Sequence, residues 1–172
     1  MSFLTRSEQE HIDTVIENLR MKTGLSFPED NLVDLAKALG VEVYESKFVK
    51  HQNIDGFLEY PKKLTDKPKI YLNKERPSVR KKFTLAHELG HFVLHRDDKR
   101  RYRVDSLDYS LNDDETREET EANYFAASLL VPEEKLRSLL ALSNGNIEVA
   151  AEYFGVSKPV IENRIKWLNK NQ

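Results

Sequence analysis

The chain has 172 residues, of which 39% are hydrophobic and 33% are charged. Roughly 150 residues is typical of one domain, and the composition is that of a globular protein rather than a disordered or fibrous one. A formal net charge of −2 does not favour a nucleic-acid-binding protein. The absence of cysteine excludes disulfides, cysteine-ligated metal sites and a thiol nucleophile. The polar N-terminus and the lack of an apolar run of ~20 residues predict no signal peptide or membrane segment, so we expect a cytoplasmic protein.

The first half of the chain predicts two helices and a small sheet. Apolar side chains recur at helical spacing in residues 7–20, and Pro28 opens a second helical pattern that Gly40 ends. Three segments have the alternation or composition of strands: residues 41–45, 57–60 and 69–73. Because Pro61 and its polar neighbours mark a turn between the last two, we expect a small antiparallel sheet.

The second half of the chain is predominantly helical in its pattern. Five segments show this spacing: residues 77–95, 115–130, 132–142, 147–154 and 157–168. Residues 96–114 are strongly charged and are predicted to form a loop. The order of helices, small sheet and helices predicts an α+β fold.

The most informative segment contains the pattern His87-Glu88-x-x-His91 inside a strong helical repeat. Residues i and i+4 lie on one face of a helix, so both imidazoles can reach one zinc ion at about 2.0–2.1 Å. Glu88 lies about 100° around the helix from His87, where it can sit beside the metal and accept a proton from water. The alternative is a helix with two solvated histidines and a surface glutamate, which the helical context and the acidic segment downstream disfavour.

A catalytic zinc site needs three protein ligands and one open position. His95 lies about 12 Å along the helix axis from His87, so an unbroken helix cannot bring it to the same ion. In metzincins a glycine breaks the helix before the third histidine, but here that position is Leu94. His95 could face the cleft, cap the helix end or lie at the surface, and we favour the last two.

The acidic helix of residues 115–130 is the better source of the third ligand. We favour Glu119, because Asn123 lies one turn later on the same face and can form a hydrogen bond with a ligand imidazole. Glu118 and Glu121 remain alternatives, since runs of glutamate usually form a solvated face. Manganese or iron could also occupy a site of two histidines and a glutamate.

This constellation predicts hydrolysis of a carbonyl compound such as a peptide. Zinc lowers the pKa of bound water toward about 7, and Glu88 can take the proton and deliver it to the leaving amine. A further donor should stabilise the oxyanion. The candidates by residue type are His95, Tyr102, Tyr109 and Tyr124. The substrate could add as a strand to the edge of the sheet formed by residues 41–73.

Two motifs together resemble the ImmA/IrrE family of metallopeptidases. They are the run RKKFTLAHELGHFVLH, residues 80–95, and the run ETEANYFAASLLVP, residues 119–132. The helix and strand around Gly40 and the turn at residues 154–157 are similar too, so the resemblance covers nearly the whole chain. It implies one zinc ion per chain, bound by His87, His91 and Glu119, with Glu88 as the catalytic base. Val131 stands where the family commonly has Met, an apolar exchange.

The resemblance also implies a substrate and an architecture. Family members are bacterial or mobile-element proteases that cleave helix-turn-helix repressors and so relieve repression after DNA damage or related signals. Many relatives carry an N-terminal helix-turn-helix domain, whereas here we expect the repressor to be a separate polypeptide. The implied fold has a small antiparallel sheet beside a zincin-like active-site helix pair in residues 1–142. We expect a helical, helix-turn-helix-like segment, residues 143–172, to pack on this domain.

A second function class is a DNA-binding or repressor-binding regulator that acts without proteolysis. Residues 150–164 resemble a helix, a tight turn and a second helix, with Ser157 as a cap and Pro159 in the first turn. The second helix offers few DNA contacts: Lys158, Asn163, Arg164 and Lys166. A scaffold helix pair or a repressor-docking surface is therefore favoured. The basic residues 96–103 could contact phosphate, but neighbouring acidic residues favour a solvated loop.

A third class is a zinc-binding protein that sequesters a partner without cleaving it. The intact Glu88 favours chemistry over sequestration, because a purely structural zinc site needs no base beside it. The sequence gives no signal for the oligomeric state.

Overall fold

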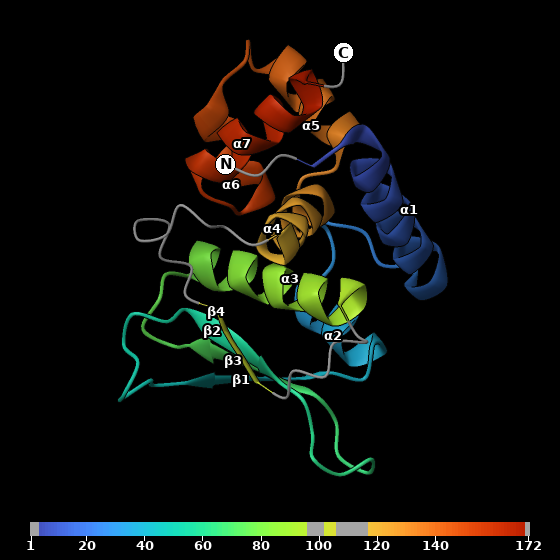
Figure 1. Ribbon diagram of the computed structural model, residues 1–172. Coiled ribbons are helices and arrows are strands. Elements are labelled where there is room, and N and C mark those ends of the chain that lie inside the picture. The colour runs from blue at the N-terminus through green and yellow to red at the C-terminus, as the bar shows by residue number, and fades with distance from the viewer. Residues whose placement is uncertain (1–3, 96–101, 106–116, 171–172) are drawn as a thin grey trace.

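The computed structural model describes residues 4–95, 102–105 and 117–170. Within these residues the helices are α1 (Arg6–Thr23), α2 (Leu32–Ala38), α3 (Ser78–Leu94), α4 (Arg117–Leu130), α5 (Glu133–Leu142), α6 (Ile147–Phe154) and α7 (Lys158–Asn169) (Figure 1). The strands are β1 (Glu42–Ser46), β2 (Gly56–Glu59), β3 (Lys69–Asn73) and β4 (Tyr102–Asp105). The predicted α+β class is confirmed, and β3 and α6 have the predicted bounds.

The four strands form one mixed sheet in the order β1-β3-β2-β4. β2 pairs antiparallel with both β3 and β4, whereas β1 pairs parallel with β3, with Val43 opposite Ile70. The prediction of an antiparallel sheet is therefore wrong for β1. The β2–β3 hairpin leaves one edge of β3 free, and β1 pairs with this edge rather than with β2, its neighbour in sequence. The prediction of a loop over residues 96–114 is also wrong at β4.

One face of the sheet packs against α3, which lies across it in Figure 1. Leu58 and Ile70 are paired on neighbouring strands and so point to the same face of the sheet. Both are fully buried. Three rings stack side by side on neighbouring strands: Tyr44, Tyr71 and Phe57, with centroids 5.0–5.6 Å apart. These rings alternate with Leu58 and Ile70 along the strands and so lie on the opposite face, while the aliphatic face packs against α3.

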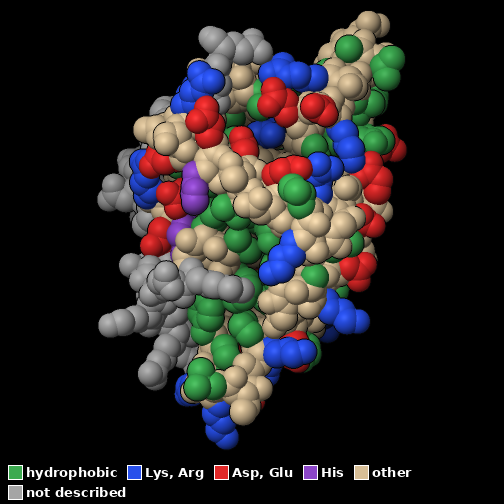
Figure 2. All heavy atoms as spheres, turned by 90° about the vertical axis from the view of Figure 1, so that its right-hand side faces the viewer, with side chains coloured by type: hydrophobic (Ala, Val, Ile, Leu, Met, Phe, Trp, Pro, Cys, Tyr) green, Lys and Arg blue, Asp and Glu red, His purple; other side chains and the backbone are tan. Residues whose placement is uncertain are grey.

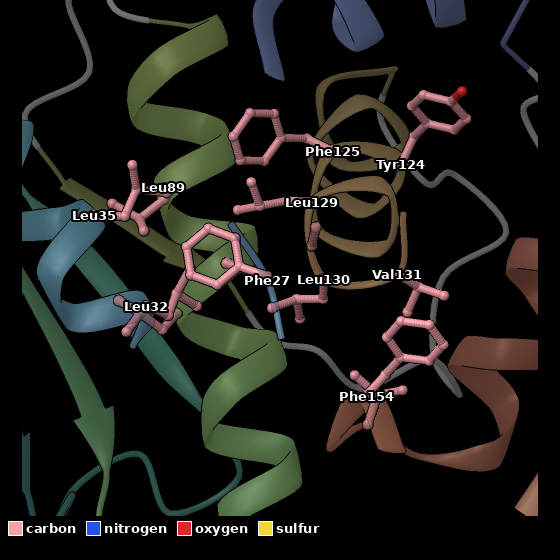
Figure 3. Packing of buried hydrophobic residues seen from close by; sticks show 14 of the residues in the cluster. Phe27, Leu32, Leu35, Leu89, Tyr124, Phe125, Leu129, Leu130, Val131 and Phe154 are labelled. Carbon is pink, nitrogen blue, oxygen red and sulfur yellow. The ribbon is translucent and has the colours of Figure 1, made fainter. Parts of the chain in front are cut away.

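α3 and α4 pack against each other in the centre of the molecule. Figure 3 shows Phe125 and Leu129 pointing from α4 toward α3, whereas Leu89 of α3 lies beside Leu35 of α2. Leu89 and Phe125 are fully buried. Phe154 of α6 packs near Val131, which follows α4, so the C-terminal helices share the same hydrophobic cluster. This helix pair is therefore held from both sides by apolar packing.

The helix ends follow local capping signals. Thr5 and Glu8 form a capping box at the start of α1, and Gly24 ends this helix with a φ of 72°. α2 begins at Leu32 because the Asn31 side chain accepts a hydrogen bond from Val33 N. The prediction that Pro28 opens this helix is wrong by about one turn, since Pro28 lies in the preceding turn.

The surface carries side chains of both charges. Figure 2 shows them around a band of hydrophobic side chains, with histidine side chains near one margin of this band. Exposed ion pairs such as Arg20–Glu17 contribute little to stability, because water screens the two charges. In the part of the chain that the structure describes, no helix has the length and apolar character needed to span a membrane.

Candidate metal centre

α3 places the three residues of the His-Glu-x-x-His motif inside the molecule. His87, Glu88 and His91 are all 0% exposed, in the part of α3 that packs on α4. The two histidine rings lie one above the other on the same helix face, with centroids 4.7 Å apart and planes at 86°. The histidines are therefore not the solvated pair of the alternative interpretation.

α4 brings the carboxylate of Glu119 to both imidazoles. The distance from Glu119 Oε2 to His87 Nε2 is 3.1 Å, and that from Oε1 to His91 Nε2 is 2.9 Å. The two Nε2 atoms are 3.1 Å apart. Among the described residues, these three are the group of histidine and acidic side chains placed to hold a metal ion. The structure thus brings together the residues predicted as ligands, with Glu119 in the place predicted for the third.

The donor set and its spacing fit a divalent metal ion. Two imidazole nitrogens and one carboxylate are ligands typical of catalytic zinc sites. Ligand atoms at about 2.0–2.1 Å from a tetrahedral ion lie about 3.3 Å from one another. The observed distances of 2.9–3.1 Å are close to this value. Only a small outward movement of the side chains would admit the ion.

Asn123 fixes the proton position on His87. His87 Nδ1 lies 2.8 Å from Asn123 Oδ1, and an amide oxygen can only accept a hydrogen bond. The Nδ1–H of His87 therefore donates to Asn123, which leaves the Nε2 lone pair for a metal ion. This hydrogen bond was predicted from the spacing of Glu119 and Asn123, and the structure contains it.

His95 caps the end of α3, as predicted, but its side chain does not lie at the surface. Its backbone ends α3, but its side chain is only 9% exposed and contacts His91 and Glu121. The His91 and His95 Nδ1 atoms are 3.1 Å apart, and His95 Nε2 lies 2.7 Å from Glu121 Oε2. Glu121 is thus engaged with His95. The repeated spacing of four residues from His87 to His91 to His95 was the signal for this contact.

Gly90 allows the two helices of the site to approach closely. A Cβ at this position would lie 3.0 Å from Phe125 Cδ1 and 3.3 Å from the Cα and carbonyl oxygen of Ala122. Ala122 lies between Glu119 and Asn123 in α4. The glycine between His87 and His91 therefore sets how near α4 carries its carboxylate to the histidines, a role that the sequence analysis did not assign.

Tyr124 does not lie at the metal centre, so its prediction as a candidate oxyanion donor is wrong. Its ring points away from α3 (Figure 3), and its hydroxyl donates to Asp13 of α1 at 3.1 Å. Burial, with the nearby Asp13 carboxylate, raises the pKa of Tyr124 to about 12. Of the other candidates, Tyr109 and the side chain of Tyr102 lie outside the described residues.

The C-terminal helix pair has the predicted helix-turn-helix form, but its packing does not suit DNA reading. Arg164 is only 4% exposed, donates to Val131 O at 3.1 Å and lies over the Tyr124 ring. Lys158 pairs with Glu148 of α6. Since Arg164 anchors α7 to the core, it is not available to contact a phosphate or a base. The basic residues 96–101 lie outside the described part of the chain.

An α+β fold with an HExxH helix packed against a glutamate-bearing helix has the construction of a metallopeptidase. The family model for the Peptidase M78, IrrE N-terminal-like domain matches residues 36–166. This match covers more than half of the chain, so the protein belongs to that family of peptidases. The resemblance found in the sequence is thereby confirmed. No curated protein matches the chain.

Proposed function

We propose that this protein is a zinc-dependent endopeptidase that hydrolyses a peptide bond in a separate helix-turn-helix repressor. The observation that carries the proposal is the convergence of His87, His91 and Glu119 within 2.9–3.1 Å, with Glu88 on the same helix. Family membership supports peptidase activity. The repressor substrate and an action in the cytoplasm, relieving repression of a mobile element or stress response, extend from the family resemblance.

His87, His91 and Glu119 would hold one zinc ion per chain. The bound ion supplies Lewis acidity, which polarises a carbonyl group and lowers the pKa of water. His87 is oriented for this role by Asn123, because the Nδ1 proton is committed to the amide oxygen. Three ligands from two rigid helices leave one coordination position for the reaction.

Glu88 is the proposed general base. It follows His87 in α3 and points about 100° around the helix, so it flanks the ligands instead of joining them. As water adds to the scissile carbonyl carbon, Glu88 accepts its proton, and it then donates that proton to the amine nitrogen when the C–N bond breaks. Complete burial of Glu88 keeps bulk water from competing for this proton.

The metal site is tested by elemental mass spectrometry of protein dialysed after zinc addition. Wild type should retain about one zinc ion per chain, as three-ligand sites do. Glu119→Ala should lose it, whereas the control Glu134→Ala on exposed α5 should keep it. Zinc retained by Glu119→Ala would move the third ligand to Glu118 or Glu121. Folded wild type without zinc would overturn the proposal.

The substrate is tested separately by searching a bacterial proteome for new N-termini after incubation with the zinc-loaded protein. We expect cleavage within helix-turn-helix repressors and none with Glu88→Gln, a variant that keeps all three ligands. Cleavage of other protein classes would support peptidase activity but would contradict a repressor as the substrate. Zinc binding without any cleavage would favour a regulator that binds a repressor or DNA.

A further inference from the structure

Behind His91, on the side of the ring away from the metal site, lies a chain of two hydrogen bonds. His91 Nδ1 contacts His95 Nδ1 at 3.1 Å, and His95 Nε2 contacts Glu121 Oε2 at 2.7 Å. Glu121 also lies 3.9 Å from Arg117 of the same helix. These hydrogen bonds therefore connect His91 on α3, through His95 at the end of α3, to the carboxylate of Glu121 on α4.

The positions of the protons in these two hydrogen bonds follow from the Glu121 carboxylate at one end. The Glu121 carboxylate can only accept, so the His95 Nε2–H donates to it. Neutral His95 then has a lone pair on Nδ1, which accepts a hydrogen bond from the His91 Nδ1–H. With its proton on Nδ1, His91 has an Nε2 lone pair to offer to a metal ion held between Glu119 and His87.

The two histidines are thus oriented by different partners. His87 donates to a neutral amide, Asn123, whereas His91 donates to an imidazole that is itself bound to a carboxylate. A hydrogen-bonded carboxylate makes the acceptor stronger and so holds the ligand ring more firmly in one orientation. The side chain of His95 is only 9% exposed, which keeps water from replacing it.

We infer that His95 and Glu121 are positioning residues that hold His91 in the orientation and tautomer that bind the metal. The inference rests on the proposed metal site and adds two residues that act through His91. Partners of this kind typically change metal affinity by 10–100-fold. They touch neither substrate nor metal, so the effect should appear in zinc affinity before any reaction is measured.

The test measures the zinc dissociation constant of the purified full chain by competition with a chromophoric chelator. His95→Phe keeps a ring but removes the acceptor, and should weaken zinc binding by about 10–100-fold. His95→Asn places an amide oxygen near the former Nδ1 position, as Asn123 does for His87, and should restore the affinity to within about tenfold of wild type. His11→Phe, on the exposed face of α1, is the matched control and should bind zinc as wild type does.

Glu121→Ala is the second variant, and it leaves α3 unchanged. It should weaken zinc binding by up to about tenfold, because His95 remains but is no longer fixed. Nitrogen NMR of the zinc-bound protein should show a His91 Nδ1–H that exchanges slowly with water in wild type and faster in both His95→Phe and Glu121→Ala. A purely structural role of His95 would not move this signal.

The outcomes separate the inference from the proposed function. Wild type that fails to bind zinc overturns the metal site itself. If wild type binds zinc and both His95→Phe and Glu121→Ala bind it equally well, the metal site stands and the positioning role of His95 and Glu121 is overturned. If His95→Phe loses zinc affinity and His95→Asn does not restore it, the effect is due to packing, and the inference is also overturned. If His95→Phe does not fold, Glu121→Ala decides by the same two measurements.

Discussion

Gly90→Ala tests whether the contact between α3 and α4 sets the geometry of the metal centre. The new Cβ would lie 3.0 Å from Phe125 Cδ1 and 3.3 Å from Ala122 Cα. Ordinary carbon–carbon contacts are about 3.5–4.0 Å. Because the obstacle at Ala122 is backbone, the two helices must separate by roughly 0.2–0.7 Å.

The expected effect on stability is small because two effects oppose each other. Overpacking of a core typically costs about 1–3 kcal/mol. Replacing glycine by alanine inside a helix gains about 0.8–1 kcal/mol. The free energy of unfolding should therefore fall by about 0–2 kcal/mol, and the metal-free variant should still fold.

The expected effect on the metal centre is larger. Ala122 lies one turn after Glu119 in α4, so a shift of α4 carries the carboxylate away from His87 and His91. Functional groups must be held within about 0.5 Å of their working geometry. We expect zinc affinity to fall about tenfold, in the range seen when the surroundings of a ligand are disturbed.

The assay combines chelator competition for zinc with urea unfolding of the metal-free protein. Phe125→Leu removes the ring edge, so the loss of affinity caused by Gly90→Ala should be smaller in that background. Ser138→Ala on the exposed face of α5 controls for helix propensity. Unchanged zinc affinity together with a stability gain of about 1 kcal/mol would refute the reasoning, because it would show that the helices have room for a methyl group.

Three further predictions address other parts of the structure. Asn123→Leu removes the acceptor for His87 Nδ1–H and should weaken zinc binding by about 10–100-fold in the chelator assay, whereas equal affinity would show that the hydrogen bond is dispensable. Tyr124→Phe tests the raised pKa. The native state holds the phenol proton up to about pH 12, so the stability that this proton contributes is present below pH 10 and is lost between pH 10 and 12. The advantage of wild type over the variant in urea unfolding should shrink by about 3 kcal/mol across that range, and a constant difference would contradict the shift. Phe154→Ala should lower the free energy of unfolding by about 3–5 kcal/mol in one transition, because the fully buried ring joins α6 to the main core. A separate early transition of the C-terminal helices would contradict that packing.

Local signals predicted the helices well. The hydrophobic repeats in α1, α3 and α5 are long enough to identify each helix, and capping residues such as Thr5 and Asn146 fix where helices begin. Non-local pairing was predicted less well. The parallel contact of β1 with β3 depends on which strand edge is free after the hairpin forms, and no residue of β1 encodes that choice.

The sequence by itself indicated the candidate chemistry of this protein. The spacing of His87 and His91 on a helix places two imidazoles on one face whatever the rest of the fold does. Glu88 beside them gave the candidate base, and Glu119 with Asn123 one turn later gave the favoured candidate for the third ligand, with Glu118 and Glu121 as alternatives. The histidines and the base needed only the 3.6-residue repeat of a helix and the ligand preferences of zinc, whereas the resemblance to the family singled out Glu119.

The tertiary structure decided what surrounds that chemistry. Whether Tyr124 faces the site, whether His95 meets water or Glu121, and how closely Gly90 lets α4 approach all depend on the relative position of two helices. That position results from apolar packing of the whole core, including the sheet on one side and α6 on the other. Packing of this kind sums many weak contacts between distant segments, so no local pattern in the chain could predict it.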